Sequence, residues 1–203
     1  HADVEVKDKN GRTPLHTVTE NCNIDIIHYL VEQCHADVEA KDKNGNTPLH
    51  IASNNGDIEV VKYLTEHCHA NFEAKENDGK TPLHIASING DIDVVKYLIE
   101  LCRANIETKD KNGRTPLHFA SMYDKVKVVK YLFEQCHANV EARDKNGWTP
   151  LHFASICGKI EVVKYLIEQC HANVEARDKN GKTPLHFAST SGKIEVVKYL
   201  IKQ

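Results

Sequence analysis

Apolar and polar residues follow a pattern that repeats every 34 residues along the chain. In the fifth copy, Ile160, Val163 and Leu166 form an apolar stripe with a spacing of three. Glu161 and Lys164 fall on the opposite side, so this segment is predicted to be an amphipathic helix. The segment Leu-His-Phe-Ala-Ser upstream of it predicts a shorter first helix, whose small Ala and Ser allow a neighbour to approach closely.

Each copy also has clear signals for where its helices begin and end. A Thr-Pro-Leu-His tetrad starts the first helix, because threonine accepts hydrogen bonds from first-turn amides and proline lacks the N–H that would be left free. The preceding Asp-Lys-Asn-Gly stretch, present in most copies, is typical of a turn. A glycine ends the first helix in four copies. Each copy is therefore predicted to be a turn followed by two helices.

Glycine and proline are distributed as in a tandem array. All six prolines lie in the tetrads, and all ten glycines fall at two places in the period. A single unit cannot bury its apolar stripe alone, so stacking of the units is required. We expect one domain over 1–203, belonging to a longer array because the last repeat has no polar cap. The predicted repeats are 1–34, 35–68, 69–102, 103–136, 137–170 and 171–203.

The tetrad, followed by Phe-Ala in the last three repeats, resembles the signature of ankyrin repeats and occurs in all six copies. The resemblance implies an all-α solenoid of stacked helix-turn-helix repeats with short β-hairpin or turn fingers. It also implies that the tetrad histidines bond to the backbone between repeats, and that the chain is a non-catalytic protein-interaction scaffold. The family unit usually has 33 residues and Gly-Ala-Asp after the second helix. Here Cys-His-Ala-Asn makes the join one residue longer, so we expect an altered helix exit.

Cysteines and histidines recur in register, which argues against a metal site. Equivalent residues of stacked helices lie about 8–10 Å apart, which is too far for a shared zinc ion or a disulfide. We expect no metal, no cofactor, and seven free thiols in a reducing compartment such as the cytosol or nucleus. Cys157, near His152, is the best candidate nucleophile. No phosphate loop or carboxylate pair accompanies it, so we expect no enzymatic activity.

Positions that differ between repeats predict the binding surface. One precedes each tetrad, and the other is a pair ending the first helix, where repeats three to five place apolar residues. Stacking should join these into an apolar strip on the concave first-helix surface; the alternative is that they tuck between repeats. The predicted partner-binding residues are Ile88, Arg114, Met122, Tyr123, Trp148, Ile156 and Cys157. Buried positions between repeats are instead predicted for Phe119, Phe153 and Phe187.

The net charge of −3 conceals two opposed halves. Repeats one to three together carry −9, whereas repeats four to six carry +6. Opposed ends predict steering of a bipolar partner, or weak head-to-tail self-association. Only Trp148 and Tyr123 interleave with the basic residues, which favours a protein partner over nucleic acid. No apolar run is long enough to span a membrane. The alternative function is a structural spacer or regulatory segment of a larger multidomain or effector protein.

Overall fold

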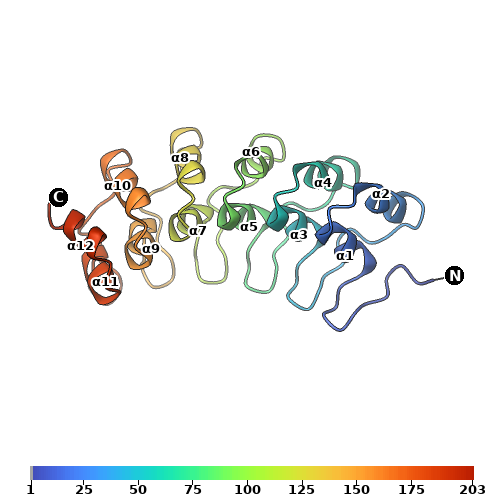
Figure 1. The fold of residues 1–203 in the computed structure, drawn as a ribbon, viewed down its shortest axis with the longest axis horizontal. Coiled ribbons are helices and arrows are strands. Elements are labelled where there is room, and N and C mark those ends of the chain that lie inside the picture. Colours follow the sequence, from blue (N-terminus) through green and yellow to red (C-terminus); the bar gives the residue numbers. More distant parts are fainter. Residues whose placement is uncertain (1) are drawn as a thin grey trace. The chain divides into compact units, whose positions relative to one another are not determined.

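The structure, a computed structural model, describes residues 2–203, and within this range it contains helices and turns but no strands (Figure 1). The first helices of the six repeats are α1 Pro14–Glu20, α3 Pro48–Asn55, α5 Pro82–Asn89, α7 Pro116–Met122, α9 Pro150–Cys157 and α11 Pro184–Thr190. The second helices are α2 Ile24–Glu32, α4 Ile58–Lys62 with its continuation η1 Tyr63–His67, α6 Ile92–Glu100, α8 Val126–Glu134, α10 Ile160–Glu168 and α12 Ile194–Leu200. None of these helices is long and apolar enough to cross a membrane.

The first helices begin at the tetrads, as predicted. Thr115 has extended backbone angles (φ −92°, ψ 167°), and Pro116 occupies the first turn of α7. The Thr115 side chain accepts a hydrogen bond from the backbone of His118, while the His118 ring accepts one from the Thr115 backbone. Histidine thus takes the place that Glu or Gln has in an ordinary capping box. The same box forms at Thr13, Thr47, Thr149 and Thr183.

Of the two expected forms of the fingers between repeats, β-hairpin or turn, the described residues adopt the turn. The Asp42 N–H donates to the Asn46 carbonyl (3.0 Å), and the Gly45 N–H donates back to the Asp42 carbonyl (3.0 Å). Gly45 has φ 81°, in the left-handed region that glycine tolerates best. The next finger follows directly, because the Asn77 N–H donates to the Asn44 carbonyl (2.8 Å). A chain of backbone bonds therefore links successive fingers within each part of the structure.

The second helices end in a widened turn, which confirms the altered exit. The Cys170 N–H donates to the Tyr165 carbonyl (3.2 Å), five residues back, and the Ala172 N–H donates to the Leu166 carbonyl (2.8 Å), six back. An i→i−5 bond is the π-type arrangement that accommodates one extra residue. His171 then reverses the chain with φ 54°, a left-handed conformation uncommon for residues other than glycine. In repeat two the widened turn extends into η1.

The core lies between the two helices of each repeat and between adjacent repeats. Val163 and Leu166 of the predicted stripe are fully buried, and Ile160 is half-buried. The three phenylalanines that follow the tetrads are at most 8% exposed, which confirms their predicted positions between repeats: Phe119, Phe153 and Phe187.

The described chain forms two compact units. Unit 1 comprises residues 1–86 and 91–105, and unit 2 comprises residues 87–90 and 106–203, so the boundary runs through α5. Within unit 1, α1 packs against α3 and α4 against α6. Within unit 2, α9 packs against α7 and α11, while α10 packs against α8 and α12. The single domain expected over 1–203 stays a prediction.

Candidate protein-interaction surface

The tetrad histidines join neighbouring repeats, as the family resemblance implied. The Thr115 N–H donates to Nδ1 of His118 (3.1 Å), so the ring proton is on Nε2, which donates to the Trp148 carbonyl (3.1 Å). Burial lowers the pKa of His118 to about 4, so the ring is neutral at pH 7. A buried, neutral imidazole whose two nitrogens are both hydrogen-bonded fixes the backbone and is not available as a general base. Equivalent bonds run from His16 to Asn46, His50 to Lys80 and His152 to Lys182.

Two further ladders of hydrogen bonds connect the repeats, and neither was predicted from the sequence. The Glu141 carboxylate accepts a hydrogen bond from the Asn173 N–H (2.8 Å), and the Tyr165 hydroxyl donates to Glu134 (2.7 Å). Their signal in the sequence is recurrence of Glu and Tyr every 34 residues. Equivalent glutamates are Glu5, Glu39, Glu73 and Glu107. These recurring side chains are therefore occupied by the scaffold.

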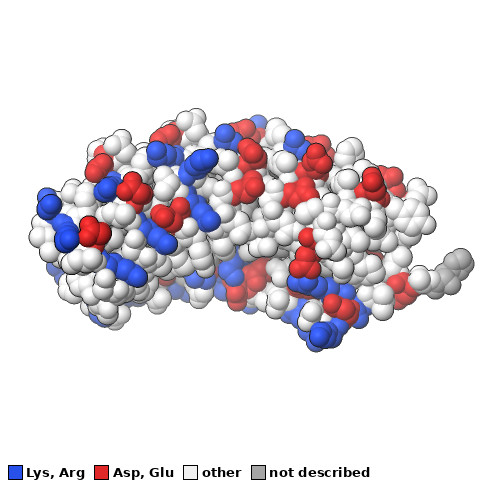
Figure 2. All heavy atoms as spheres, viewed as in Figure 1, with Lys and Arg blue, Asp and Glu red and all other residues white. Residues whose placement is uncertain are grey.

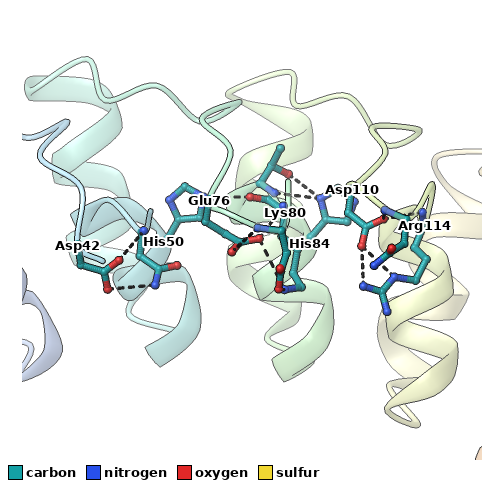
Figure 3. A network of polar contacts seen from close by, with 11 residues as sticks. Asp42, His50, Glu76, Lys80, His84, Asp110 and Arg114 are labelled. Atoms are coloured by element: carbon teal, nitrogen blue, oxygen red, sulfur yellow. Dashed lines mark hydrogen bonds and ion pairs between the residues drawn. The ribbon is translucent and has the colours of Figure 1, made fainter. Parts of the chain in front are cut away.

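In repeats two to four, the side chain of the variable residue before the tetrad contacts the acidic residue of its own finger (Figure 3). Arg114 donates through Nε to the buried Asp110 carboxylate (2.8 Å), and its guanidinium lies 4.6 Å from the centre of the Phe119 ring. In unit 1, the Lys80 Nζ lies 3.6 Å from Oε1 of the Glu76 carboxylate. Arg114 is thus a fixed cation over an aromatic core residue, with its side chain 19% exposed.

Trp148 occupies the same position in repeat five but reaches into repeat six. Its indole Nε1 donates to Asp178 (3.2 Å), and its ring centre lies 5.1 Å from that of Phe153 and 4.3 Å from that of Phe187. The side chain is half-buried. Trp148 therefore bridges two repeats and leaves only part of its ring open to solvent.

The predicted apolar strip lies in unit 2, at the C-terminal ends of the first helices. Ile88, Met122 and Ile156 are each partly exposed, and Tyr123, at the end of α7, is 47% exposed. Cys157, the last residue of α9, is also partly exposed. Because α7 and α9 pack together, Met122-Tyr123 and Ile156-Cys157 end adjacent helices. These side chains are not fully buried between repeats.

A change of charge occurs at the start of the second helices, directly after this strip. Asp91 caps α6 by accepting from the Asp93 and Val94 N–H groups (3.2 and 3.0 Å). Repeats four to six have lysines at this position, whose side chains provide no cap: Lys125, Lys159 and Lys193. Loss of a capping side chain costs about 1 kcal/mol, and a cation is unfavourable at a helix N-terminus. The basic half was predicted from the sequence, whereas this position was not.

The Cys157 thiol lacks the surroundings of a catalytic nucleophile. Burial raises its pKa above the ordinary value, and the nearby Lys159 and Lys193 offset that effect only in part. A protonated thiol is a poor nucleophile. Burial also raises the pKa of Cys170, to about 12. Across residues 2–203, no cluster of three His, Cys, Asp or Glu side chains is placed to hold a metal ion.

Unit 1 has a different, polar hollow on its first-helix side. Its volume is about 210 Å³, and the ion pair between Arg12 and Glu20 (2.7 Å) lies in its wall. His50 and Asn46 also line it. Both of these residues belong to the inter-repeat bonds described above, so we assign the hollow to the scaffold.

The comparison with known protein families agrees with the repeated pairs of helices described above. The family model for ankyrin repeats matches in three copies, at residues 1–75, 66–144 and 135–203, which together cover the whole chain. No curated protein matches the sequence significantly. Ankyrin repeats in general are protein–protein interaction modules, and the family is typically non-catalytic.

Proposed function

This chain belongs to the ankyrin-repeat family, and from that premise we propose that it binds a partner protein through unit 2. The docking surface comprises the seven residues predicted from the sequence: Ile88, Arg114, Met122, Tyr123, Trp148, Ile156 and Cys157. The observation that carries the proposal is the exposure of Tyr123, together with the partial exposure of Met122 and Ile156, on adjacent first helices.

Repeat six shows that the fold does not require apolar residues at these places. Its first helix ends in Thr190-Ser191, and Ser191 closes the helix with a backbone bond to Phe187, as Tyr123 does to Phe119. The apolar pairs of repeats four and five therefore add exposed apolar surface that the scaffold does not need. Exposed apolar residues with an aromatic and an arginine beside them are characteristic of interface centres.

The chain contains one Met and one Trp, which makes the test specific. We expect a ligand selected from a displayed library of random 12-residue peptides to shift both the methyl NMR signal of Met122 and the indole N–H signal of Trp148. A scrambled version of the ligand is the control and should leave both signals in place. If saturating ligand moves neither signal, the docking surface is wrong, and the alternative of a structural spacer or regulatory segment is favoured.

Head-to-tail self-association is a second proposal, supported by the terminal repeats. Repeat one carries −3 and repeat six +3, so contact between copies should strengthen at low salt. Light scattering is expected to give a mass above that of one chain at about 20 mM salt and a single-chain mass at about 500 mM. A single-chain mass at both salt concentrations would reject self-association.

The seven free cysteines support a reducing compartment, such as the cytosol or nucleus, as the place where this binding occurs.

A further inference from the structure

Three lysines form a row along one edge of unit 2. Lys125, Lys159 and Lys193 directly precede α8, α10 and α12. In Figure 2, Lys and Arg side chains lie over these helices, interspersed with Asp and Glu side chains. None of the three makes an ion pair with any residue of the described range. The corresponding residues of unit 1, by contrast, are used as helix caps: Asn23, Asp57 and Asp91.

The lysine row lies against the docking surface. The methylene groups of Lys193 pack over Gly158, because a Cβ added at this glycine would lie 2.8 Å from the lysine Cδ. Lys125 packs over Gly90 in the same way, and a Cβ added there would lie 2.5 Å from the Cδ of Lys125. Lys159 and Lys193 both act electrostatically on the Cys157 thiol. Their ammonium groups are therefore held beside the pair Ile156-Cys157 that ends α9, and the stem of Lys193 packs on Gly158.

We propose that the lysine row extends the docking surface and selects an acidic peptide segment of the partner, bound in an extended conformation with apolar side chains on the strip. This inference rests on the proposed function. Charge complementarity supports it, because three cations without ion-pair partners border a strip of partly exposed apolar side chains. The same edge of unit 1 carries carboxylates that are already hydrogen-bonded, so the acidic segment is specific to unit 2.

The spacing of the repeats defines the pattern of the ligand. Stacked helices repeat about every 8–10 Å, and an extended peptide advances about 3.3 Å per residue. Every third residue of the ligand should therefore meet the next repeat. Acidic residues with a spacing of three, with apolar residues between them, are the expected pattern.

A peptide fits this surface better than a nucleic acid does. Single-stranded nucleic acid requires aromatic platforms on which bases stack. Next to the lysine row the strip offers Met122, Ile156 and the exposed ring of Tyr123, whereas the Trp148 ring is packed on Phe153 and Phe187. Aliphatic side chains suit apolar residues of a peptide, while the ammonium groups suit its carboxylates.

The test uses a variant that should fold better than the parent. In K125D/K159D/K193D each lysine is replaced by the residue that caps the second helix in repeats two and three. We expect the unfolding midpoint to rise by about 5 °C. The probes are the peptides that the intact chain enriches from the displayed 12-residue library. Their affinity for the variant should fall about 30-fold or more, and affinity for the intact chain should weaken with salt.

The matched control changes the same charge on the second helices. K130D/K164D/K198D alters the net charge equally in the same three repeats, at residues that lie within α8, α10 and α12. Affinity for the enriched peptides should stay within about threefold of the parent. An equal loss in both variants would show that only net charge matters and would overturn the role of the lysine row.

The remaining outcomes separate this inference from the proposed function. Enriched peptides that shift the Met122 and Trp148 signals, lack acidic residues and bind the aspartate variant normally would refute the acidic ligand and leave the docking surface intact. Peptides that shift neither signal would refute both the acidic ligand and the docking surface. Competition by an oligothymidylate as effective as unlabelled peptide would indicate a polyanion site and overturn the peptide assignment.

Discussion

Replacing His118 by alanine is expected to destabilise the chain by about 3–5 kcal/mol. The side chain is fully buried. It accepts from the Thr115 N–H (3.1 Å) and donates to the Trp148 carbonyl (3.1 Å). The substitution removes both bonds, takes one of its two hydrogen-bond donors from the Trp148 carbonyl of the next repeat, and opens a cavity. The free energy of unfolding from a urea titration measures the loss.

His186 provides a matched control, because it makes only the first of these two contacts. Its Nδ1 accepts from the Thr183 N–H (3.2 Å), but its side chain is exposed. His186→Ala should therefore cost about 1 kcal/mol, the value of a lost cap. Equal losses in the two variants would contradict the assignment of the larger effect to the bond between repeats.

Acidification from about pH 6.5 to about pH 4 is expected to remove about 3 kcal/mol of stability through His118 alone. Burial lowers the pKa of His118 from 6.5 to about 4. The unfolded chain therefore takes up a proton near pH 6.5, whereas the folded chain resists it until about pH 4. The stabilising contribution is complete above pH 6.5 and is lost as the pH falls through this window. Burial lowers the pKa of His50 and His152 as well, and these act in the same direction.

Urea unfolding at a series of pH values tests this expectation. Titration of Asp178 does not overlap this pH window. Its pKa lies below the ordinary 3.8, so its effect on stability occurs at a lower pH. His118→Ala should flatten the pH dependence between about pH 6.5 and about pH 4, since it removes the largest single contribution. An unchanged slope in that variant, or stability that rises on acidification, would contradict the neutral buried imidazole.

The sequence predicted the repeat, its two helices and the residues between repeats because these features recur. Thr-Pro-Leu-His appears six times in register, and one physical role explains each residue of it. An altered helix exit was expected from the extra residue at the Cys-His join. Its form was not, because left-handed His171 and the bond from Cys170 to the Tyr165 carbonyl depend on tertiary packing of the turn.

The interaction surface was less accessible to sequence reasoning. Position within the repeat identified Trp148 as variable, but only the structure shows that its ring packs on Phe153 and Phe187. Likewise, the basic character of repeats four to six was visible as a sum of charges. The path of Lys193 across Gly158 depends on how neighbouring repeats are stacked.

The most direct measurement of the central claim is the affinity of a variant whose apolar pairs are exchanged for the polar pair of repeat six. In M122T/Y123S/I156T/C157S, both pairs become Thr-Ser, which the fold already accepts at Thr190-Ser191. We predict an unfolding midpoint within about 3 °C of the parent and affinity for the enriched peptides at least about 100-fold weaker. An affinity within about threefold of the parent, in a folded variant, would contradict the claim that variable residues of unit 2 bind the partner.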